Sequence, residues 1–374
     1  MSRALPAAAV ALAAAVAAGA AGCRRDAGPV RIAVVLPADF AAPALLAAAE
    51  INAAGGIRGR RLEIVRDTVR LGTPDVESMD IVRARSVLRK PVVAVLGHEG
   101  SGSSLTAAPV YNAAGVVQLV PTGTSRLLAR AGPWTLALAP NDSAEGGFIA
   151  GFVRDRLRGS RALLFHSNDR YGIGLRDGVR AALAGRGVRV VGDVRYDALA
   201  DLAVLAAAAV KRAPPDVVVV AGYAREVAHI AAALRAAGVR APIVAGDGAH
   251  ALPTLVATSP GAAEGMYVVT FWLPGAADSA TRHFEAAVRS RLGREPAARD
   301  AMAYDGMRLL AAAVQAAGTR PGRVLAYLRA LGVSRPRWRG LTGEIGFGAG
   351  AGPPRFVMGQ VRGSVIVPAG ADPR

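Results

Sequence analysis

Residues 92–125 read VVAVLGHEGSGSSLTAAPVYNAAGVVQLVPTGTS, and this stretch decides the fold class. Its pattern predicts a strand over residues 92–96, a loop rich in Gly and Ser over 97–104, a helix over 105–114 and a second strand over 116–120. A Pro-Thr-Gly-Thr turn follows the second strand. A strand, a hydroxyl-rich turn and a helix start, used twice in succession, are typical of a parallel α/β sheet.

Hydroxyl side chains gather where these two strands end. They are Ser101, Ser103, Ser104, Thr122 and Thr124. Open α/β sheets bind ligands at the carboxyl ends of their strands, and a helix start offers unpaired N–H groups and the positive end of a dipole. The stretch therefore favours a pocket for a small anion. The alternative is that these residues only cap helices and close turns, and the segment alone leaves both interpretations open.

The same alternation continues on both sides of this stretch. Apolar strands are expected over residues 30–36, 61–67, 135–138, 162–166, 188–196, 217–220 and 243–245, with helices between them that include 173–184 and 202–212. Residues 141–143 are expected to cap a helix over 144–157. The C-terminal third adds a strand at 265–270, helices at 277–292, 298–317 and near 322–331, and a pair of strands around Arg362-Gly363. Two runs of βαβ units, in a chain of 374 residues, imply two doubly wound lobes.

The charge of +17 is carried almost wholly by Arg, since Lys90 and Lys211 are the only lysines. The Arg residues are scattered singly, whereas a nucleic-acid footprint needs a cluster or stripe of basic residues. We therefore expect no nucleic-acid partner. With 52% hydrophobic and only 5% aromatic residues, the core must be built from Ala, Val and Leu.

The N-terminus has the pattern of an export signal. A basic start at residues 1–3 precedes an apolar run at 4–21, and the small residues Ala20, Ala21 and Gly22 precede Cys23. This end resembles the lipobox of bacterial lipoproteins, although Ala20 stands where Leu is usual. We expect a signal peptide at 1–22, lipidation of Cys23 and a tether at 23–29. An uncleaved anchor or a secretory signal with an incidental Cys are the alternatives, and all three place the rest outside the cytoplasmic membrane.

Enzymatic signatures are absent from the sequence. The single cysteine excludes an intramolecular disulfide and a thiolate metal cluster, and the five histidines lack metal-ligand spacing. Ser101 is not in a G-x-S-x-G elbow, because Glu99 occupies the first glycine position. Neither a Walker A sequence nor a G-x-G-x-x-G fingerprint follows the first strand. We expect no catalytic residues, no metal and no cofactor; an exported hydrolase is the enzyme-class alternative.

Seven stretches in order resemble the periplasmic branched-chain-amino-acid-binding proteins, the solute receptors of ABC importers. They are INAAGGIRG at 51–59, VLGHEGSGSS at 95–104, VPTGTS at 120–125, DRYGIG at 169–174, VVVAGY at 218–223, AEGMYV at 263–268 and AYDGMRL at 303–309. The resemblance covers nearly all of the chain after the export signal. It implies a type I periplasmic binding fold, in which two Rossmann-like doubly wound lobes are joined by three hinge crossings and hold the ligand between them.

The resemblance also implies where the chain crosses. The crossings are expected near residues 138–141, 265–269 and 341–343. Lobe 1 is then formed by 30–139 plus 269–340, and lobe 2 by 140–268 plus 341–374.

The matching motifs carry ligand positions across. Ser101 corresponds to the loop serine that bonds the ligand carboxylate, and Thr122, Gly123 and Thr124 to the turn that meets the ammonium and carboxylate groups. In the second lobe Tyr171 and Tyr223 correspond to aromatic rings that close on the ligand, and Asp247 to the acid that pairs with the ammonium. The alternatives are that the tyrosines only pack and that Asp247 only stabilises its turn.

One departure concerns the segment Pro37–Glu50, which is shorter than usual in the family and lacks a Gly-rich turn and aromatic contacts beside the ligand side chain. Phe40 stands in for them, or the pocket is open there. The ligand's identity therefore does not carry over, and relatives bind other amino acids, amides, urea-like compounds or aromatic acids.

The resemblance implies a periplasmic or cell-surface, lipid-anchored monomer that captures a small amino-acid-like ligand and delivers it to ABC permease and ATPase subunits. The alternative is a sensing or protein-docking receptor without a transport role.

Overall fold

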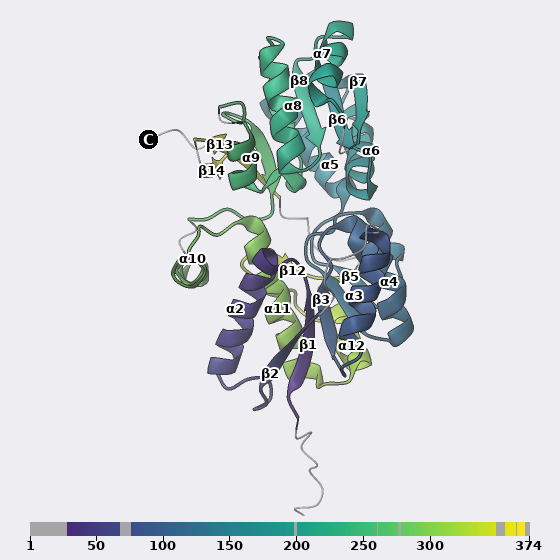
Figure 1. Cartoon of the computed structure of the whole chain (residues 1–374), viewed down its shortest axis with the longest axis vertical. Helices are drawn as coiled ribbons and strands as arrows, with labels where there is room; N and C mark the ends of the chain where they lie inside the picture. Colours follow the sequence, from purple (N-terminus) through teal and green to yellow (C-terminus); the bar gives the residue numbers. More distant parts are fainter. Residues whose placement is uncertain are drawn as a thin grey trace, which may run out of the picture.

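The computed structural model describes residues 28–67, 76–197, 200–259, 261–275, 278–348, 356–363 and 365–370. The expected signal peptide and Cys23 lie outside these residues. Two lobes lie one above the other, and β1 begins at the end of the first lobe that is farther from the second (Figure 1).

The first lobe contains a parallel sheet of five strands in the order β2-β1-β3-β4-β5. These are β1 (Val30–Val35), β2 (Leu62–Arg66), β3 (Ala94–Gly97), β4 (Val117–Val120) and β5 (Thr135–Ala137). Its helices are α2 (Ala38–Ala53), α3 (Val76–Val87), α4 (Ser101–Ala114), α10 (Ser279–Leu292), α11 (Ala298–Ala317) and α12 (Pro321–Ala330). Nearly all residues of β1, β3 and β4 are buried on both faces, so the sheet lies between layers of helices.

The second lobe contains seven strands in the order β14-β13-β10-β9-β8-β6-β7. The parallel part comprises β6 (Arg161–Ser167), β7 (Arg189–Tyr196), β8 (Val217–Ala221), β9 (Ile243–Ala245) and β10 (Tyr267–Thr270). The hairpin of β13 (Val357–Arg362) and β14 (Val365–Pro368) adds two antiparallel strands. Its helices are α5 (Asp142–Gly151), α6 (Arg170–Ala184), α7 (Leu202–Arg212), α8 (Ala224–Ala236) and α9 (Leu252–Thr258).

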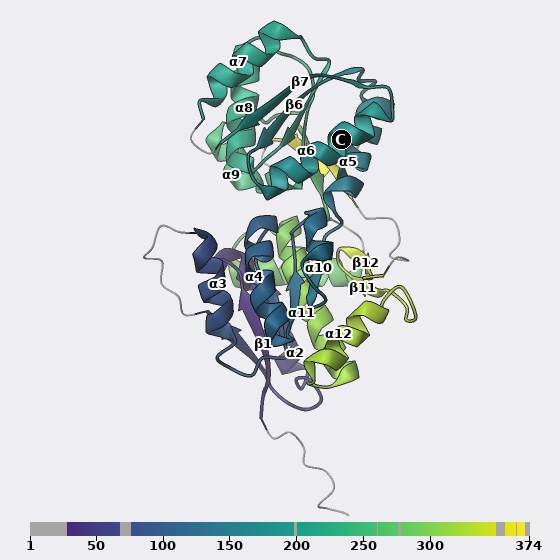
Figure 2. The ribbon, with the colours of Figure 1, turned by 90° about the vertical axis from the view of Figure 1, so that its right-hand side faces the viewer.

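Helices α5 and α6 pack through glycines at the side of the second lobe that faces the first (Figures 1 and 2). A Cβ on Gly146 would lie 2.3 Å from the backbone carbon of Gly178, and one on Gly178 would lie 2.4 Å from the carbonyl oxygen of Asp142. Any side chain at these positions would force the helices apart, because real Cβ atoms do not approach other atoms this closely. The two helices therefore form one rigid support for the residues at their N-termini.

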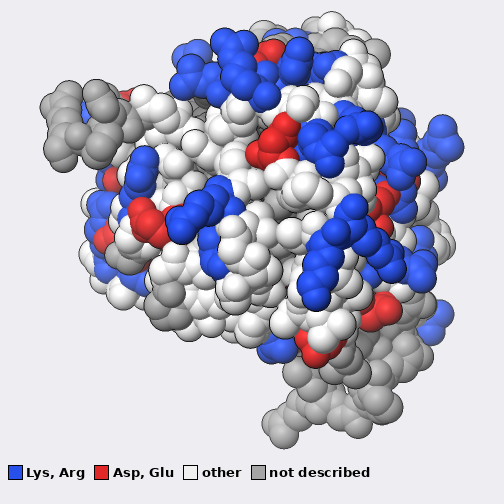
Figure 3. All heavy atoms as spheres, turned by 90° about the horizontal axis from the view of Figure 1, so that it is seen from above, with Lys and Arg blue, Asp and Glu red and all other residues white. Residues whose placement is uncertain are grey.

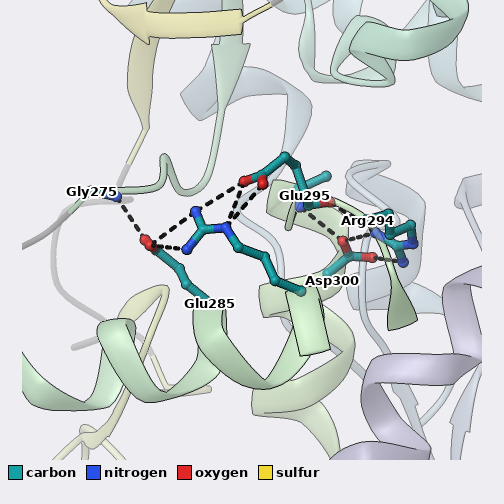
Figure 4. Close-up of polar contacts among 7 residues, drawn as sticks. Gly275, Glu285, Arg294, Glu295 and Asp300 are labelled. Atoms are coloured by element: carbon teal, nitrogen blue, oxygen red, sulfur yellow. Dashed lines mark hydrogen bonds and ion pairs between the residues drawn. The ribbon is translucent and has the colours of Figure 1, made fainter. Parts of the chain in front are cut away.

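Charged residues fix the path from β10 into the helices α10 and α11 of the first lobe (Figure 4). Glu285 accepts a hydrogen bond from the N–H of Gly275 at 2.7 Å, and Arg289 bonds to Glu285 and Glu295. Near the start of α11 Arg294 donates to the completely buried carboxylate of Asp300, which also accepts from the N–H of Ala297 at 2.8 Å. Charged side chains of α10, of α11 and of the loop between them thus hold this part of the chain in place.

The predicted alternation of strands and helices is confirmed, with four main differences. Helix α4 begins at Ser101 instead of residue 105, and α6 begins at Arg170 instead of 173, because Asp169 caps it. The helix α9 was not predicted, and neither was the two-stranded sheet of β11 (Trp338–Gly340) and β12 (Gly343–Ile345). The predicted hairpin around Arg362-Gly363 is present as β13 and β14.

The lobe boundaries expected from the sequence remain a proposal, which is supported by the strands of the five-stranded and seven-stranded sheets but not by β12. Ile345 is buried in the core of the first lobe, and Trp338 and Phe347 pack against that core. We therefore propose that the third crossing lies after Phe347 and not at 341–343.

The upper face of the second lobe, seen in Figure 3, carries several separate groups of Lys and Arg side chains with Asp and Glu among them. In the described part of the chain, the helices are all too short or too polar to cross a membrane.

Candidate functional site

The N-terminus of α4 is open to a ligand in the way that the sequence predicts. Gly100 precedes the helix with a left-handed φ of 72°, and no side chain among the described residues caps the first turn. By contrast, Asn141 caps α5 and Asp169 caps α6 through their side-chain oxygens. The first N–H groups of α4 therefore remain available to an anion, and the helix dipole favours negative charge there.

Ser101 joins this helix start to the turn after β4. Its Oγ accepts hydrogen bonds from the N–H of Thr124 at 3.3 Å and from that of Ser125 at 3.1 Å. Gly123 completes the contact, because a Cβ there would lie 3.2 Å from the carbonyl oxygen of Gly100 and closer still to two apolar side chains. The structure thus brings together Ser101, Gly123 and Thr124.

The two threonines of the turn differ in their surroundings. The hydroxyl of Thr124 is buried and has no partner at full hydrogen-bond geometry among the described residues, but it lies close enough to the carboxyl group of Asp142 to act on the pKa of that acid and lower it. Thr122 is half-buried. A buried hydroxyl without a full hydrogen bond is uncommon in folded proteins, and a ligand that accepts its proton is one explanation.

The expected aromatic residues of the second lobe also lie together. Tyr171 is buried at the start of α6, and its ring centre lies 5.3 Å from that of Tyr223. The Tyr171 hydroxyl accepts a hydrogen bond from the N–H of Gly248 at 2.8 Å, which ties it to the Asp247 turn. Tyr223 remains 44% exposed.

Asp247 begins a short 3₁₀ turn, Asp247–Ala249, directly after β9. Its N–H donates to Oε1 of Glu145 at 2.9 Å, and its own Oδ1 has no hydrogen-bond partner among the described residues. Burial raises the pKa of Asp247, while the adjacent His250 and the Tyr171 hydroxyl act to lower it. The carboxyl group is therefore buried, close to Tyr171, and incompletely paired.

Asp142 stands between the two lobes. Its N–H donates to the carbonyl oxygen of Thr124 at 2.8 Å, while its side chain is completely buried and both carboxyl oxygens lack partners among the described residues. Burial raises the pKa of Asp142 to about 7. A Cβ on Gly174 would collide with one oxygen of the Asp142 carboxyl group, so α6 packs closely against this group.

The expected ligand residues therefore form two groups. Ser101, Thr122, Gly123 and Thr124 belong to the first lobe, and Tyr171, Tyr223 and Asp247 to the second. Asp142 links the groups, through its bond to Thr124 and its charge interaction with Asp247.

Sequence reasoning assigned residues 141–143 to a helix cap and overlooked Glu145. The signal available was the spacing of Asp142 and Glu145, since residues three apart lie on one face of a helix.

Two other features lie apart from these groups. His98 is buried, with Nδ1 2.8 Å from Asp80 and Nε2 3.0 Å from the hydroxyl of Tyr111, so both ring nitrogens have hydrogen-bond partners within the fold. A surface cavity of 830 Å³ lies between α2 and β2, lined by residues that include Asn52 and Leu62. None of the expected ligand residues lines it.

The sequence of this chain matches the family model "Periplasmic binding protein" over residues 33–362. It is 30% identical over 154 residues to an amino acid binding protein of Pseudomonas aeruginosa, covering 41% of this chain and 40% of the relative. It is 28% identical over 207 residues to the Leu/Ile/Val-binding protein of Escherichia coli strain K12, covering 54% of each. The matched segments thus span about half the length of these relatives.

The fold is similar to that of the LivJ substrate-binding protein of a branched-chain amino acid transporter from Streptococcus pneumoniae, solved in complex with isoleucine. The TM-score is 0.80 at 24% identity, and the alignment covers 90% of this chain and 97% of that one. The likeness shows the type of fold, in which helices flank two mainly parallel sheets.

Proposed function

The chain belongs to the periplasmic binding protein family, and we propose that it captures a small amino-acid-like ligand between its two lobes and delivers it to an ABC importer. The resemblance to the branched-chain-amino-acid-binding proteins and the type I periplasmic binding fold, both predicted from the sequence, are confirmed by the family model and the similar structures. The family consists of extracytoplasmic solute-binding proteins. The ligand, the delivery and the anchor are our proposals.

The observation that carries the proposal is the contrast between the two groups of site residues. The first lobe offers the uncapped N-terminus of α4, a donor site suited to a carboxylate. The second lobe offers the incompletely paired carboxyl group of Asp247 beside Tyr171, an acceptor site suited to an ammonium group. A zwitterionic α-amino acid carries one group of each kind.

We assign the contacts as follows. Ser101 and the turn Thr122-Gly123-Thr124 hold the ligand carboxylate, with the hydroxyl of Thr124 as a donor. Asp247 holds the ammonium group, and Tyr171 and Tyr223 cover it. Charge-assisted hydrogen bonds of this kind are stronger than neutral ones, and more so where water is excluded.

Closure is a hinge motion in this proposal. A ligand that contacts both lobes favours the closed state by the difference between its affinities for the two states. The bond from the Asp142 N–H to Thr124 lies at the expected first crossing, next to the residues that receive the carboxylate. Movement of the lobes is thereby coupled to the carboxylate site.

We propose that the region for the ligand side chain is more open than in the family pattern. Phe40, the residue expected to replace the missing aromatic contacts, is fully buried in the core of the first lobe beneath the guanidinium of Arg299. This packing supports the open-pocket alternative for segment 37–50. We propose that selectivity comes mainly from the head groups.

We further propose that the chain works as a lipid-anchored monomer, attached through Cys23 on the outer side of a bacterial membrane. Its partners are then the permease and ATPase subunits of the importer. Metabolic labelling with a radioactive fatty acid tests the anchor: the wild type should be labelled and Cys23→Ala should not, and absence of label from both would contradict lipidation of Cys23.

A thermal-shift screen tests the ligand class. The protein is mixed with each common amino acid, with amides, with urea and with small aromatic acids. A ligand at 100 times its dissociation constant stabilises the folded state by about 2.7 kcal/mol. Stabilisation by an amino acid supports the proposal, and stabilisation by only urea or aromatic acids overturns the ammonium assignment. If no compound acts, the proposal fails and a protein-docking role takes its place.

A further inference from the structure

Glu145 on α5 is a completely buried acid that the assigned contacts do not use. Its Oε1 accepts the N–H of Asp247 at 2.9 Å, and its Oε2 has no hydrogen-bond partner among the described residues. The Oδ1 atom of Asp247 lacks a partner as well. Two carboxyl groups thus adjoin each other in the interior, and each leaves one oxygen unpaired.

Two adjoining buried carboxyl groups do not both ionise, because the desolvated like charges repel each other. One proton shared between them removes this repulsion and gives each group a hydrogen-bond partner. The pair is asymmetric: the side-chain contact acts to raise the pKa of Glu145 and to lower that of Asp247. The proton therefore resides on Glu145, and Asp247 keeps the negative charge.

The surrounding groups reinforce this asymmetry. Asp142, one turn earlier on α5, raises the pKa of Glu145 further by its charge. A hydrogen bond from the Tyr171 side chain on α6 acts to lower the pKa of Asp247. Burial lowers the pKa of His250, which follows the 3₁₀ turn, so its ring is mainly neutral at neutral pH and does not offset the acids. Asp142 and Tyr171 thus both favour a neutral Glu145 beside an ionised Asp247.

We propose that Glu145 is a positioning residue of the ligand site, which stays protonated at neutral pH and donates its proton in a hydrogen bond to Asp247. This inference rests on the proposed function, in which Asp247 receives the ligand's ammonium group. Glu145 does not touch the ligand. It aims the Asp247 carboxylate, and because it stays neutral, the pair of Glu145 and Asp247 carries one negative charge for one ammonium group.

The first test needs no ligand. Unfolding of the full chain by urea is measured between about pH 5 and pH 8 for the wild type and for Glu145→Gln, which is isosteric and always neutral. A proton held only in the folded state lowers the folding equilibrium constant by up to about tenfold per pH unit as the pH rises. We expect the wild-type profile to be steeper than that of Glu145→Gln by up to this factor, and parallel profiles would overturn the proposal.

The second test concerns positioning, with L-leucine as the calorimetric probe. Gln retains a donor toward Asp247, so Glu145→Gln should bind within about threefold of the wild type, whereas Glu145→Leu should bind at least tenfold more weakly. Equal loss in both variants would contradict the donor role. If L-leucine binds to neither the wild type nor the variants, the choice of ligand has failed and the unfolding profiles still decide where the proton lies.

If Glu145→Gln does not fold, infrared spectroscopy of the wild type replaces the profiles. The carbonyl stretch of a protonated carboxylic acid should be present at neutral pH and should shift on isotopic labelling of glutamate. A band that shifts only on labelling of aspartate would place the proton on an aspartate and overturn the proposal.

Discussion

The backbone N–H of Asp142 donates a hydrogen bond to the carbonyl oxygen of Thr124 at 2.8 Å, and this bond joins the first residue of α5 to the turn after β4. The N–H of Thr124 is in turn held by Ser101 Oγ. The turn after β4 is thus bonded both to α4 of the first lobe and to α5 of the second. In our account, movement of the lobes is coupled to ligand binding through this turn.

Replacing the proposed ammonium partner should weaken binding strongly. Asp247→Ala is expected to cost about 2–5 kcal/mol of affinity for an amino-acid ligand, because one member of a buried charge pair is removed. Isothermal titration calorimetry measures the loss. Asp177→Ala is the control, since it removes the same charge from an exposed position on α6. Unchanged affinity in Asp247→Ala would remove the ammonium role.

Ser101 should matter for stability even without ligand. Ser101→Ala leaves the buried N–H groups of Thr124 and Ser125 without their acceptor, which is expected to cost about 1–3 kcal/mol in the free energy of unfolding. Ser103→Ala, on the same helical turn but partly exposed, should change it by less than about 0.5 kcal/mol. Equal effects in urea denaturation would show that the turn does not depend on Ser101.

Two glycines of α5 provide a matched pair of variants that tests the contact between α5 and α6. Gly146→Ala drives a methyl group into the backbone of Gly178 and should destabilise the second lobe by about 1–3 kcal/mol or more. Gly147→Ala on the same helix meets open space and should stabilise it by about 0.5–1 kcal/mol. The free energies of unfolding should therefore change in opposite directions, and destabilisation by both variants would contradict the packing described.

The buried carboxyl group of Asp142 predicts a pH dependence. Its pKa is raised to about 7, whereas an unfolded Asp titrates near 3.9. A raised pKa means that the folded state binds the proton more tightly, so this contribution is present at low pH and is lost as pH rises toward 7. The loss amounts to about 4 kcal/mol at most.

Asp142→Asn should flatten this part of the profile and should be more stable than the wild type above about pH 7. Urea denaturation at a series of pH values measures both effects. A variant that is less stable than the wild type at alkaline pH would show that the ionised carboxylate has a partner.

Most of the fold followed from the sequence because its strands are strong apolar runs between Gly-rich turns. The helices α7 and α11 and the strand β9 have the predicted bounds. The helix α9 was missed because it is short and has a proline near its start, and β11 and β12 because each has three residues and a glycine. Such segments are set by tertiary packing rather than by local preference.

The candidate site was predictable only in part, because a sequence shows an acid but not its burial. Asp247 was found through its motif after β9, whereas Glu145 resembled an ordinary helix residue. It matters because β9 and α5 meet in the fold, which brings residues 102 positions apart into hydrogen-bond contact. Long-range contacts of this kind need the tertiary structure.

The most direct test of the central claim separates the two head groups of the ligand. The unfolding temperature is measured with each protein amino acid and, for any that acts, with the analogue that lacks the ammonium group and the one that lacks the carboxylate. Our account predicts that at least one amino acid raises the unfolding temperature and that neither of its analogues does so at the same concentration. No effect from any amino acid, or an equal effect from either analogue, would contradict it.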